Sequence, residues 1–184
     1  MKLLWIILLS TFLFSQNIYK DEDVKTENNI TIDKITNKPI NGVVHIYTTD
    51  ANPNYLIFEH PYKNGKLDGV VKGFWDTDLV MSETPYKNGK KIGGSRFFYM
   101  TGELDVEYPG ENGVEKRYYK NGNLKQEVTY KNSKAIEGYK YTAYGLKTKM
   151  TNAHIYNINM SHDKIMKKIK ERKKKQEKDK NIKK

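Results

Sequence analysis

The chain has 184 residues, 37% of them hydrophobic and 30% charged, a composition that suits one domain with a modest core. It contains no cysteine, which excludes disulfides, thiolate metal sites and thiol nucleophiles. The formal net charge is +11, but twelve Lys and Arg against four Asp and Glu in residues 161–184 supply +8 of it, so the rest of the chain is nearly neutral.

The N-terminus has the layout of a secretory signal. One positive charge at Lys2 precedes an apolar run over residues 3–14, and the chain turns polar at Ser15. The run is shorter than the ~20 residues that cross a bilayer. The pattern predicts a signal peptide over 1–15, followed by a lead-in over 16–34, and an exported protein that is periplasmic, cell-envelope associated or extracellular. A buried N-terminal helix or an uncleaved anchor is the alternative.

A repeated turn motif dominates the middle of the chain. Tyr-Lys-Asn-Gly-Lys at 62–66 recurs at 86–90, and again at 130–134 with Ser133 in place of glycine. Asn and Gly tolerate the positive φ that tight hairpin turns require. Glycines that lead into aromatic stretches head five units, at Gly42, Gly69, Gly93, Gly113 and Gly138. Since one hairpin is only marginally stable, the units are expected to stack edge to edge over 35–147.

These turns, the glycine-led strands that end in aromatics and the Asn-Gly-x-Leu turn at 121–124 resemble the bacterial MORN-repeat variant proteins. Many of those are described as YwqK-like toxin–antitoxin antidotes. The resemblance implies an all-β fold, an elongated antiparallel meander of MORN-type β-hairpin repeats, here with an N-terminal signal peptide and a C-terminal basic helix. By description it also implies neutralisation of a toxin.

The aromatic residues of the units are expected to form a ladder on one face of the sheet, where cross-strand aromatic pairs stabilise neighbouring strands. This face is the candidate binding surface for an unidentified protein or cell-envelope component. The four residues predicted to form it are Tyr47, Trp75, Tyr99 and Tyr119.

No catalytic, cofactor-binding or metal-binding residue is predicted. The four histidines are scattered and form no ligand motif, and no nucleophile elbow, Walker loop or dinucleotide fingerprint occurs. Four carboxylates near strand segments could in principle form a glycosidase pair, but ordinary cross-strand polar pairs explain them better. They are Glu83, Asp105, Glu107 and Glu127. A nucleic-acid partner is not expected, because the body is nearly neutral and the chain is predicted to be exported.

After an expected linker over 148–160, residues 161–184 predict a basic helix and tail. Ser161 can cap the helix, and Ile165, Met166 and Ile169 make a short apolar stripe. The helix can close the exposed edge of the last hairpin, or its charge can serve as an arm for an anionic membrane surface. The candidate anionic-surface contacts are Lys167, Lys168, Lys170, Arg172, Lys173, Lys174 and Lys175.

The sequence therefore predicts an exported, non-catalytic repeat protein that presents an aromatic sheet face to a protein or envelope partner. Two alternatives remain open at this stage. One is an antitoxin-like antidote that binds a toxin protein, and the other is a cell-envelope hydrolase.

Overall fold

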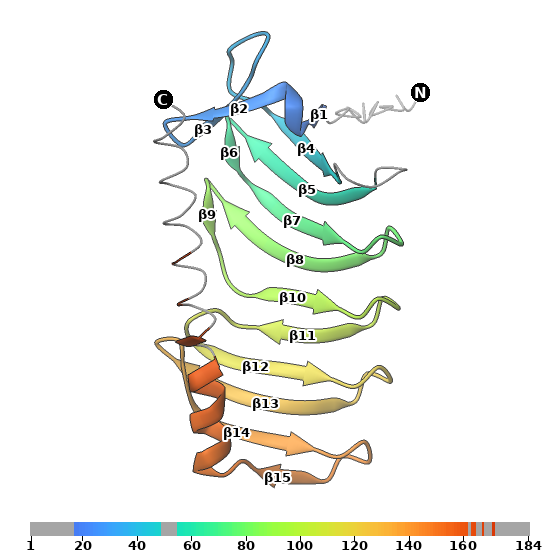
Figure 1. Ribbon diagram of the computed structural model, residues 1–184, viewed down its shortest axis with the longest axis vertical. Helices are drawn as coiled ribbons and strands as arrows, with labels where there is room; N and C mark the ends of the chain where they lie inside the picture. The colour runs from blue at the N-terminus through green and yellow to red at the C-terminus, as the bar shows by residue number, and fades with distance from the viewer. Residues whose placement is uncertain (1–16, 49–54, 162, 165–166, 168–170, 172–184) are drawn as a thin grey trace, which may run out of the picture.

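The structure, a computed structural model, describes residues 17–48, 55–161, 163, 164, 167 and 171. It is mostly β, with one large mixed sheet and a C-terminal helix (Figure 1). Eleven strands follow one another across the sheet in the order β1-β4-β5-β7-β8-β10-β11-β12-β13-β14-β15. All neighbours on this path pair antiparallel except β1 and β4, which are parallel. The predicted antiparallel meander thus describes the path from β4 onward. The expected signal segment 1–15 lies outside the described residues.

The axes of the long strands on this path are nearly aligned, and successive strands join at short turns on both sides of the sheet (Figure 1). Two short strands, β6 and β9, extend the hairpin ends of β5 and β8, and β2 and β3 form a separate two-stranded sheet. The bounds are β1 Ile18–Lys20, β2 Val24–Glu27, β3 Ile30–Asp33, β4 Gly42–Tyr47, β5 Leu56–Lys63, β6 Lys66–Leu67, β7 Gly69–Phe74, β8 Val80–Lys87, β9 Lys90–Lys91, β10 Ser95–Phe98, β11 Leu104–Tyr108, β12 Gly113–Tyr118, β13 Leu124–Lys131, β14 Lys134–Tyr141 and β15 Lys147–Lys149.

The Tyr-Lys-Asn-Gly motif forms a two-residue hairpin turn that also docks on the preceding unit. Lys87 pairs with Lys90 across Asn88 and Gly89, and both turn residues have positive φ, 49° and 79°. The Gly89 N–H donates to the Leu67 carbonyl at 2.8 Å, and the Asn88 N–H donates to Asp68 Oδ2 at 3.2 Å. The turn therefore stabilises both its own hairpin and the stack of units.

The same docking recurs at the other two copies of the motif. The Asn64 N–H donates to Asn41 Oδ1, and the Asn132 N–H donates to Asn112 Oδ1, each at 2.9 Å. Ser133 takes the glycine position with φ 62°. A side-chain oxygen just before a glycine-led strand thus accepts from the next turn in each case. This contact explains why the motif recurs together with Asn or Asp before the strand.

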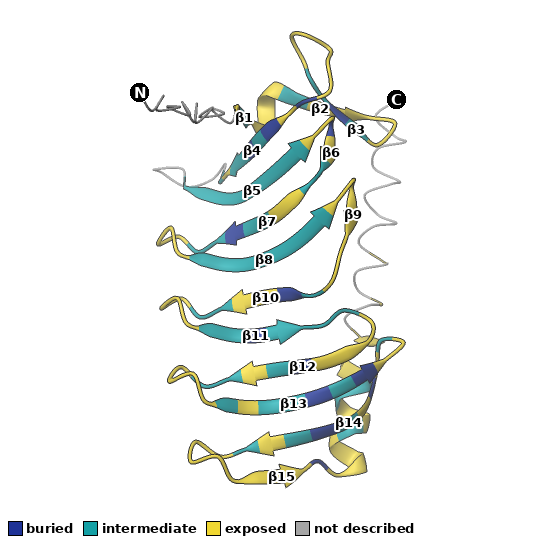
Figure 2. Ribbon diagram, turned by 180° about the vertical axis from the view of Figure 1, so that it is seen from behind, coloured by how far each residue is buried: buried dark blue, intermediate teal, exposed yellow. Residues whose placement is uncertain are grey.

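Most buried residues lie toward the two ends of the sheet, and single buried residues lie on β7, β10 and β11 between them (Figure 2). Ile40 and Val44 are 1% and 2% exposed beside the N-terminal strands. At the other end Val128, Tyr130, Ala135 and Met150 form a buried cluster against which Ile155 and Ile158 of the C-terminal helix pack. In β5 and β8, between the two ends, no residue is buried.

Both flanks of the repeats differ from the sequence-based boundaries. The lead-in 16–34 contains three strands, and β1 extends the sheet. The expected linker 148–160 instead contains part of β15 and the first turns of the helix, which begins at Asn152. Thr151 Oγ1 accepts the His154 N–H at 3.3 Å, so Thr151, rather than Ser161, caps this helix. Ile165, Met166 and Ile169 lie outside the residues whose side chains are described.

The fifth expected unit head is also placed differently. Gly42, Gly69 and Gly113 each begin a strand, but Gly138 is the fifth residue of β14, opposite Val128. A Cβ on Gly138 would lie 2.7 Å from Met150 Sδ and 3.1 Å from the Glu127 carbonyl oxygen. The absence of a Cβ at Gly138 therefore leaves room for Met150 and for Ile155 of the helix, whose Cδ1 would lie 3.3 Å from that Cβ, to pack on the sheet.

Candidate binding face

One face of the sheet carries a row of residues that are direct cross-strand partners, one from each strand of the path. We call this the charged row, and the face that carries it the charged face. In spatial order the row is Lys20, His45, Glu59, Lys72, Glu83, Arg96, Glu107, Lys116, Glu127, Tyr139 and Lys149. From Glu59 to Glu127 acids and bases alternate without interruption. Each of these glutamates has a basic residue on both sides, except Glu127, which has Lys116 on one side and Tyr139 on the other.

Several neighbours in the charged row are close enough to form ion pairs. Glu83 Oε2 lies 2.5 Å from Arg96 Nη2, and Glu59 lies 3.8 Å from Lys72 Nζ. His45 Nε2 lies 3.5 Å from the other oxygen of Glu59. Opposite charges placed directly across strands stabilise that pairing, and like charges destabilise it. The alternation therefore favours this strand register over one shifted by a residue, which would move the row to the other face.

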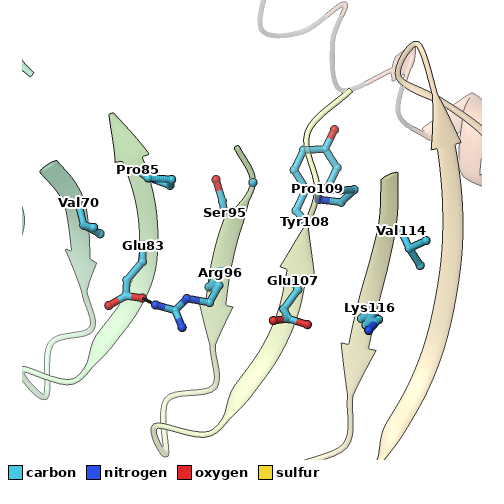
Figure 3. A pocket seen from close by; sticks show the side chains of 11 residues that line it. Val70, Glu83, Pro85, Ser95, Arg96, Glu107, Tyr108, Pro109, Val114 and Lys116 are labelled. Carbon is cyan, nitrogen blue, oxygen red and sulfur yellow. Dashed lines mark ion pairs between the residues drawn. The ribbon is translucent and has the colours of Figure 1, made fainter. Parts of the chain in front are cut away.

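A second row of apolar residues runs beside the charged row on the same face. Its members stand two positions along each strand from a charged residue, so they point the same way. Figure 3 shows Val70, Pro85, Pro109 and Val114 on one side and Glu83, Arg96, Glu107 and Lys116 on the other. Val70 and Val114 are each 42% exposed. The charged face is therefore amphipathic across its width.

A shallow hollow of about 570 Å³ lies between these two rows, where β8, β10 and β11 meet. Gly94 lies in the hollow, and a Cβ there would collide with the Tyr108 carbonyl oxygen. Since only glycine fits so close to a neighbouring backbone, the apolar row has a gap at this point. The hollow thus offers an apolar floor with two acids and two bases along one side.

The four predicted ladder residues occupy two different repeat positions. Trp75, Tyr99 and Tyr119 directly follow β7, β10 and β12, and each donates its backbone N–H across the turn. Tyr47 is instead the last residue of β4, the position held by Phe74 in β7. Neighbouring positions on a strand point to opposite faces, so Tyr47 belongs to a different row from the other three.

Tyr99 and Tyr119, which directly follow their strands, bridge adjacent units. Tyr99 Oη donates to the Tyr118 carbonyl at 2.8 Å, and Tyr119 Oη donates to the Tyr141 carbonyl at 2.9 Å. Both rings are half-buried at the turns. These side chains hold successive hairpins together, a role that accounts for their repetition without a ligand.

The four carboxylates weighed for catalysis each have a partner within the sheet. Arg96 stands between Glu83 and Glu107 in the charged row. The Tyr118 hydroxyl donates to Glu107, and burial together with this bond raises the pKa of Tyr118 to about 12. Glu127 accepts from Tyr141, and Asp105 lies beside the Tyr99 hydroxyl, whose pKa is raised by burial and by the Asp105 carboxylate. The arrangement is that of cross-strand polar pairs.

Within the described ranges, no three His, Asp or Glu side chains are grouped so that they could hold a metal ion. The same residues include no helix that is both long and apolar enough to cross a membrane. Of the predicted anionic-surface contacts, Lys167 is helical and exposed. The side chains of Lys168, Lys170, Arg172, Lys173, Lys174 and Lys175 lie outside the described residues.

Comparison with known proteins supports a MORN-repeat protein. Residues 111–132 match the family model of the MORN repeat variant. This segment contains β12, its turn and β13, and the Asn132 to Asn112 hydrogen bond joins its two ends. The matched sequence therefore corresponds to one docked unit of the sheet. No curated protein and no solved structure matches the chain.

Proposed function

We propose that this protein is an exported, non-catalytic binding or scaffold protein built from MORN-type hairpins, and that it holds a protein or cell-envelope partner on the charged face. The observation that carries the proposal is the pair of parallel rows, one apolar and one of alternating charge, with a hollow between them. The family match to residues 111–132 is consistent with such a role.

The chemistry of the two rows suits a protein interface. Interfaces combine an apolar centre with a polar rim, and the rim charges set specificity more than affinity. Exposed Val70 and Val114 supply apolar surface beside the hollow, while the charged row supplies both signs. A partner with a protruding apolar side chain and flanking charges would complement this surface.

The proposal places binding on the charged face rather than on the predicted aromatic ladder. Tyr99 and Tyr119 use their hydroxyls to bridge units, so they support the fold. Val70→Glu combined with Val114→Glu is therefore expected to abolish capture of the partner. Leu79→Glu is the matched control, because Leu79 is equally exposed at 42% but does not line the hollow.

The experiment is a pull-down of the chain from Gln16 onward against an envelope extract, with both variants in parallel. Loss of the captured component in the double variant, and its retention in Leu79→Glu, supports the proposal. Unchanged capture by the double variant contradicts it. A single stoichiometric protein that is toxic when expressed alone would favour the antidote alternative. Substrate turnover that disappears in Glu83→Gln would favour the hydrolase.

Export is the second part of the proposal, supported by the charged start, apolar run and polar exit of residues 1–17. N-terminal sequencing of the protein recovered from outside the cytoplasm is expected to begin close to Gln16. Recovery only from the cytoplasm with Met1 intact would contradict export and would strengthen the antidote alternative.

A further inference from the structure

The C-terminal helix and the sheet enclose a second groove, on the face opposite the charged row. Its volume is about 620 Å³. The sheet wall includes Arg117, Gln126 and Lys140, which are direct cross-strand partners on β12, β13 and β14. Side chains in such positions stand about 5 Å apart on one face. Two long basic side chains thus flank one amide along this wall.

The helix wall presents polar side chains at regular spacing. His154, Asn157 and Ser161 are three and four residues apart, so they share one face of the helix. The helix is fixed against the sheet by Asn159, whose side-chain amide accepts from the Ala135 N–H at 2.8 Å and donates to the Ala135 carbonyl at 3.0 Å. The two walls are therefore held in register before any ligand arrives.

The charge of the groove is unbalanced. Arg117, Lys125 and Lys140 line it, and Glu115 is the one acid among the described lining residues. Glu115 is 5% exposed and its Oε1 lies 2.7 Å from Arg117 Nε, so this pair neutralises itself. Lys125 and Lys140 are both exposed. Their charge is left to attract an anion.

We propose that this groove binds an acidic segment of a protein partner. Lys140 and Lys125 supply the charge complement for carboxylates, and Gln126 and Asn157 can each donate to and accept from a peptide backbone. Ile158, which is half-buried, adds apolar surface for the aliphatic part of an acidic side chain. This mixed lining fits a peptide better than bare phosphate, which needs only donors. The inference concerns the face opposite the charged row and does not depend on the function proposed for that row.

The test is a nuclear magnetic resonance titration of the chain from Gln16 onward with an acetylated, amidated peptide of alternating glutamate and leucine. Saturable shifts are expected at the amides of Gln126, Lys140 and Asn157. Lys140→Glu is expected to weaken binding by about tenfold or more, because it places like charge against the ligand. Lys134→Glu makes the same charge change on the same strand outside the groove, and is expected to weaken binding by less than about twofold.

Four results would overturn the inference. The first is the absence of saturable shifts at the groove, and the second is equal weakening by the two variants, which would indicate a diffuse charge effect. The third is equal binding of the peptide with glutamine in place of glutamate. Binding of pyrophosphate at these amides without binding of the peptide would overturn it in favour of a phosphate ligand. Lys140→Gln replaces Lys140→Glu in the comparison if the latter does not give a folded spectrum.

Discussion

The C-terminal end of the sheet and its central strands are built from related units but are held together differently. At the C-terminal end the helix covers β13 and β14 and creates a buried cluster around Val128 and Met150. In the centre, β5 and β8 have no buried residue, and the described residues that contact them come mainly from the same sheet. The centre therefore depends on hydrogen bonds and cross-strand pairs, whereas the end also has a hydrophobic core.

This difference shows how one repeat can serve in two environments. The docked turn, as at Asn88 and Gly89, satisfies the backbone at each step of the stack whether or not a second layer is present. Nearest-neighbour contacts of this kind propagate along a repeat array, and the terminal units need a cap. At the C-terminal end the helix covers the face of β13 and β14, while β15 is the outer strand, and at the other end β1 joins the sheet near buried Ile40.

The largest effect is expected when equivalent tyrosines are truncated in the two environments. Tyr130 and Tyr86 both precede the repeated turn, but Tyr130 is 7% exposed under the helix and Tyr86 is half-buried. Tyr130→Ala is expected to lower the free energy of unfolding by about 3 kcal/mol, because it leaves a cavity in the core. Tyr86→Ala should cost about 1 kcal/mol. Urea denaturation measures both, and equal losses would contradict the comparison.

A smaller loss is expected at a turn in the single-layer centre. Gly89 has φ 79°, and the nearest atom to a Cβ added at this position would be Lys66 Cβ at 3.8 Å, so space is available there. Gly89→Val should nevertheless cost about 1 to 3 kcal/mol, since a β-branched residue is strained at positive φ. Lys90→Val, one residue later in β9, is the control. Superimposable thermal melts of Gly89→Val and the parent protein would refute the assigned turn.

Introducing a glycine into the corresponding turn at the C-terminal end is expected to stabilise the protein. Ser133 holds φ 62° where the other copies of the turn have glycine. Ser133→Gly should raise the free energy of unfolding by about 0.5 kcal/mol, because relief of the left-handed strain exceeds the extra entropy of glycine in the unfolded chain. Chemical denaturation against Lys134→Gly, which should be destabilising, measures the gain. A loss of stability in Ser133→Gly would show that its hydroxyl contributes more than its strain costs.

The smallest effect is expected from pH. Burial beside Phe58 lowers the pKa of His60, with ring centroids 5.7 Å apart. The unfolded chain therefore binds the proton more readily, so stability is full above the unfolded pKa of about 6.5 and falls as the pH drops through it. The free energies of unfolding of the parent protein and of His60→Gln, measured across this pH range, should change with pH at different slopes. Identical slopes would show that His60 does not titrate differently in the folded state.

Several features could be read from the sequence because they depend on local chemistry. The positive φ required by a tight turn favours Asn and Gly, so the repeats at 62–66 and 86–90 identified their hairpins directly. The recurrence of one unit also predicted a mostly β protein. The prediction that Gly138 heads a unit was wrong, because the sequence does not distinguish a glycine that makes room for a packing contact from one that forms a turn.

The candidate sites depended on pairing that sequence spacing could not reveal. The sequence determined that this chain forms stacked hairpins, since turn residues and strand alternation act over a few neighbouring positions. Bulges near the strand ends, as between Arg117 and Tyr118, shift the register, so only the tertiary structure decided that Glu83, Arg96 and Glu107 are neighbours in one row. It also decided that the helix begins at Asn152 and forms a groove with the sheet, because Asn159 recognises the backbone of Ala135, 24 residues away.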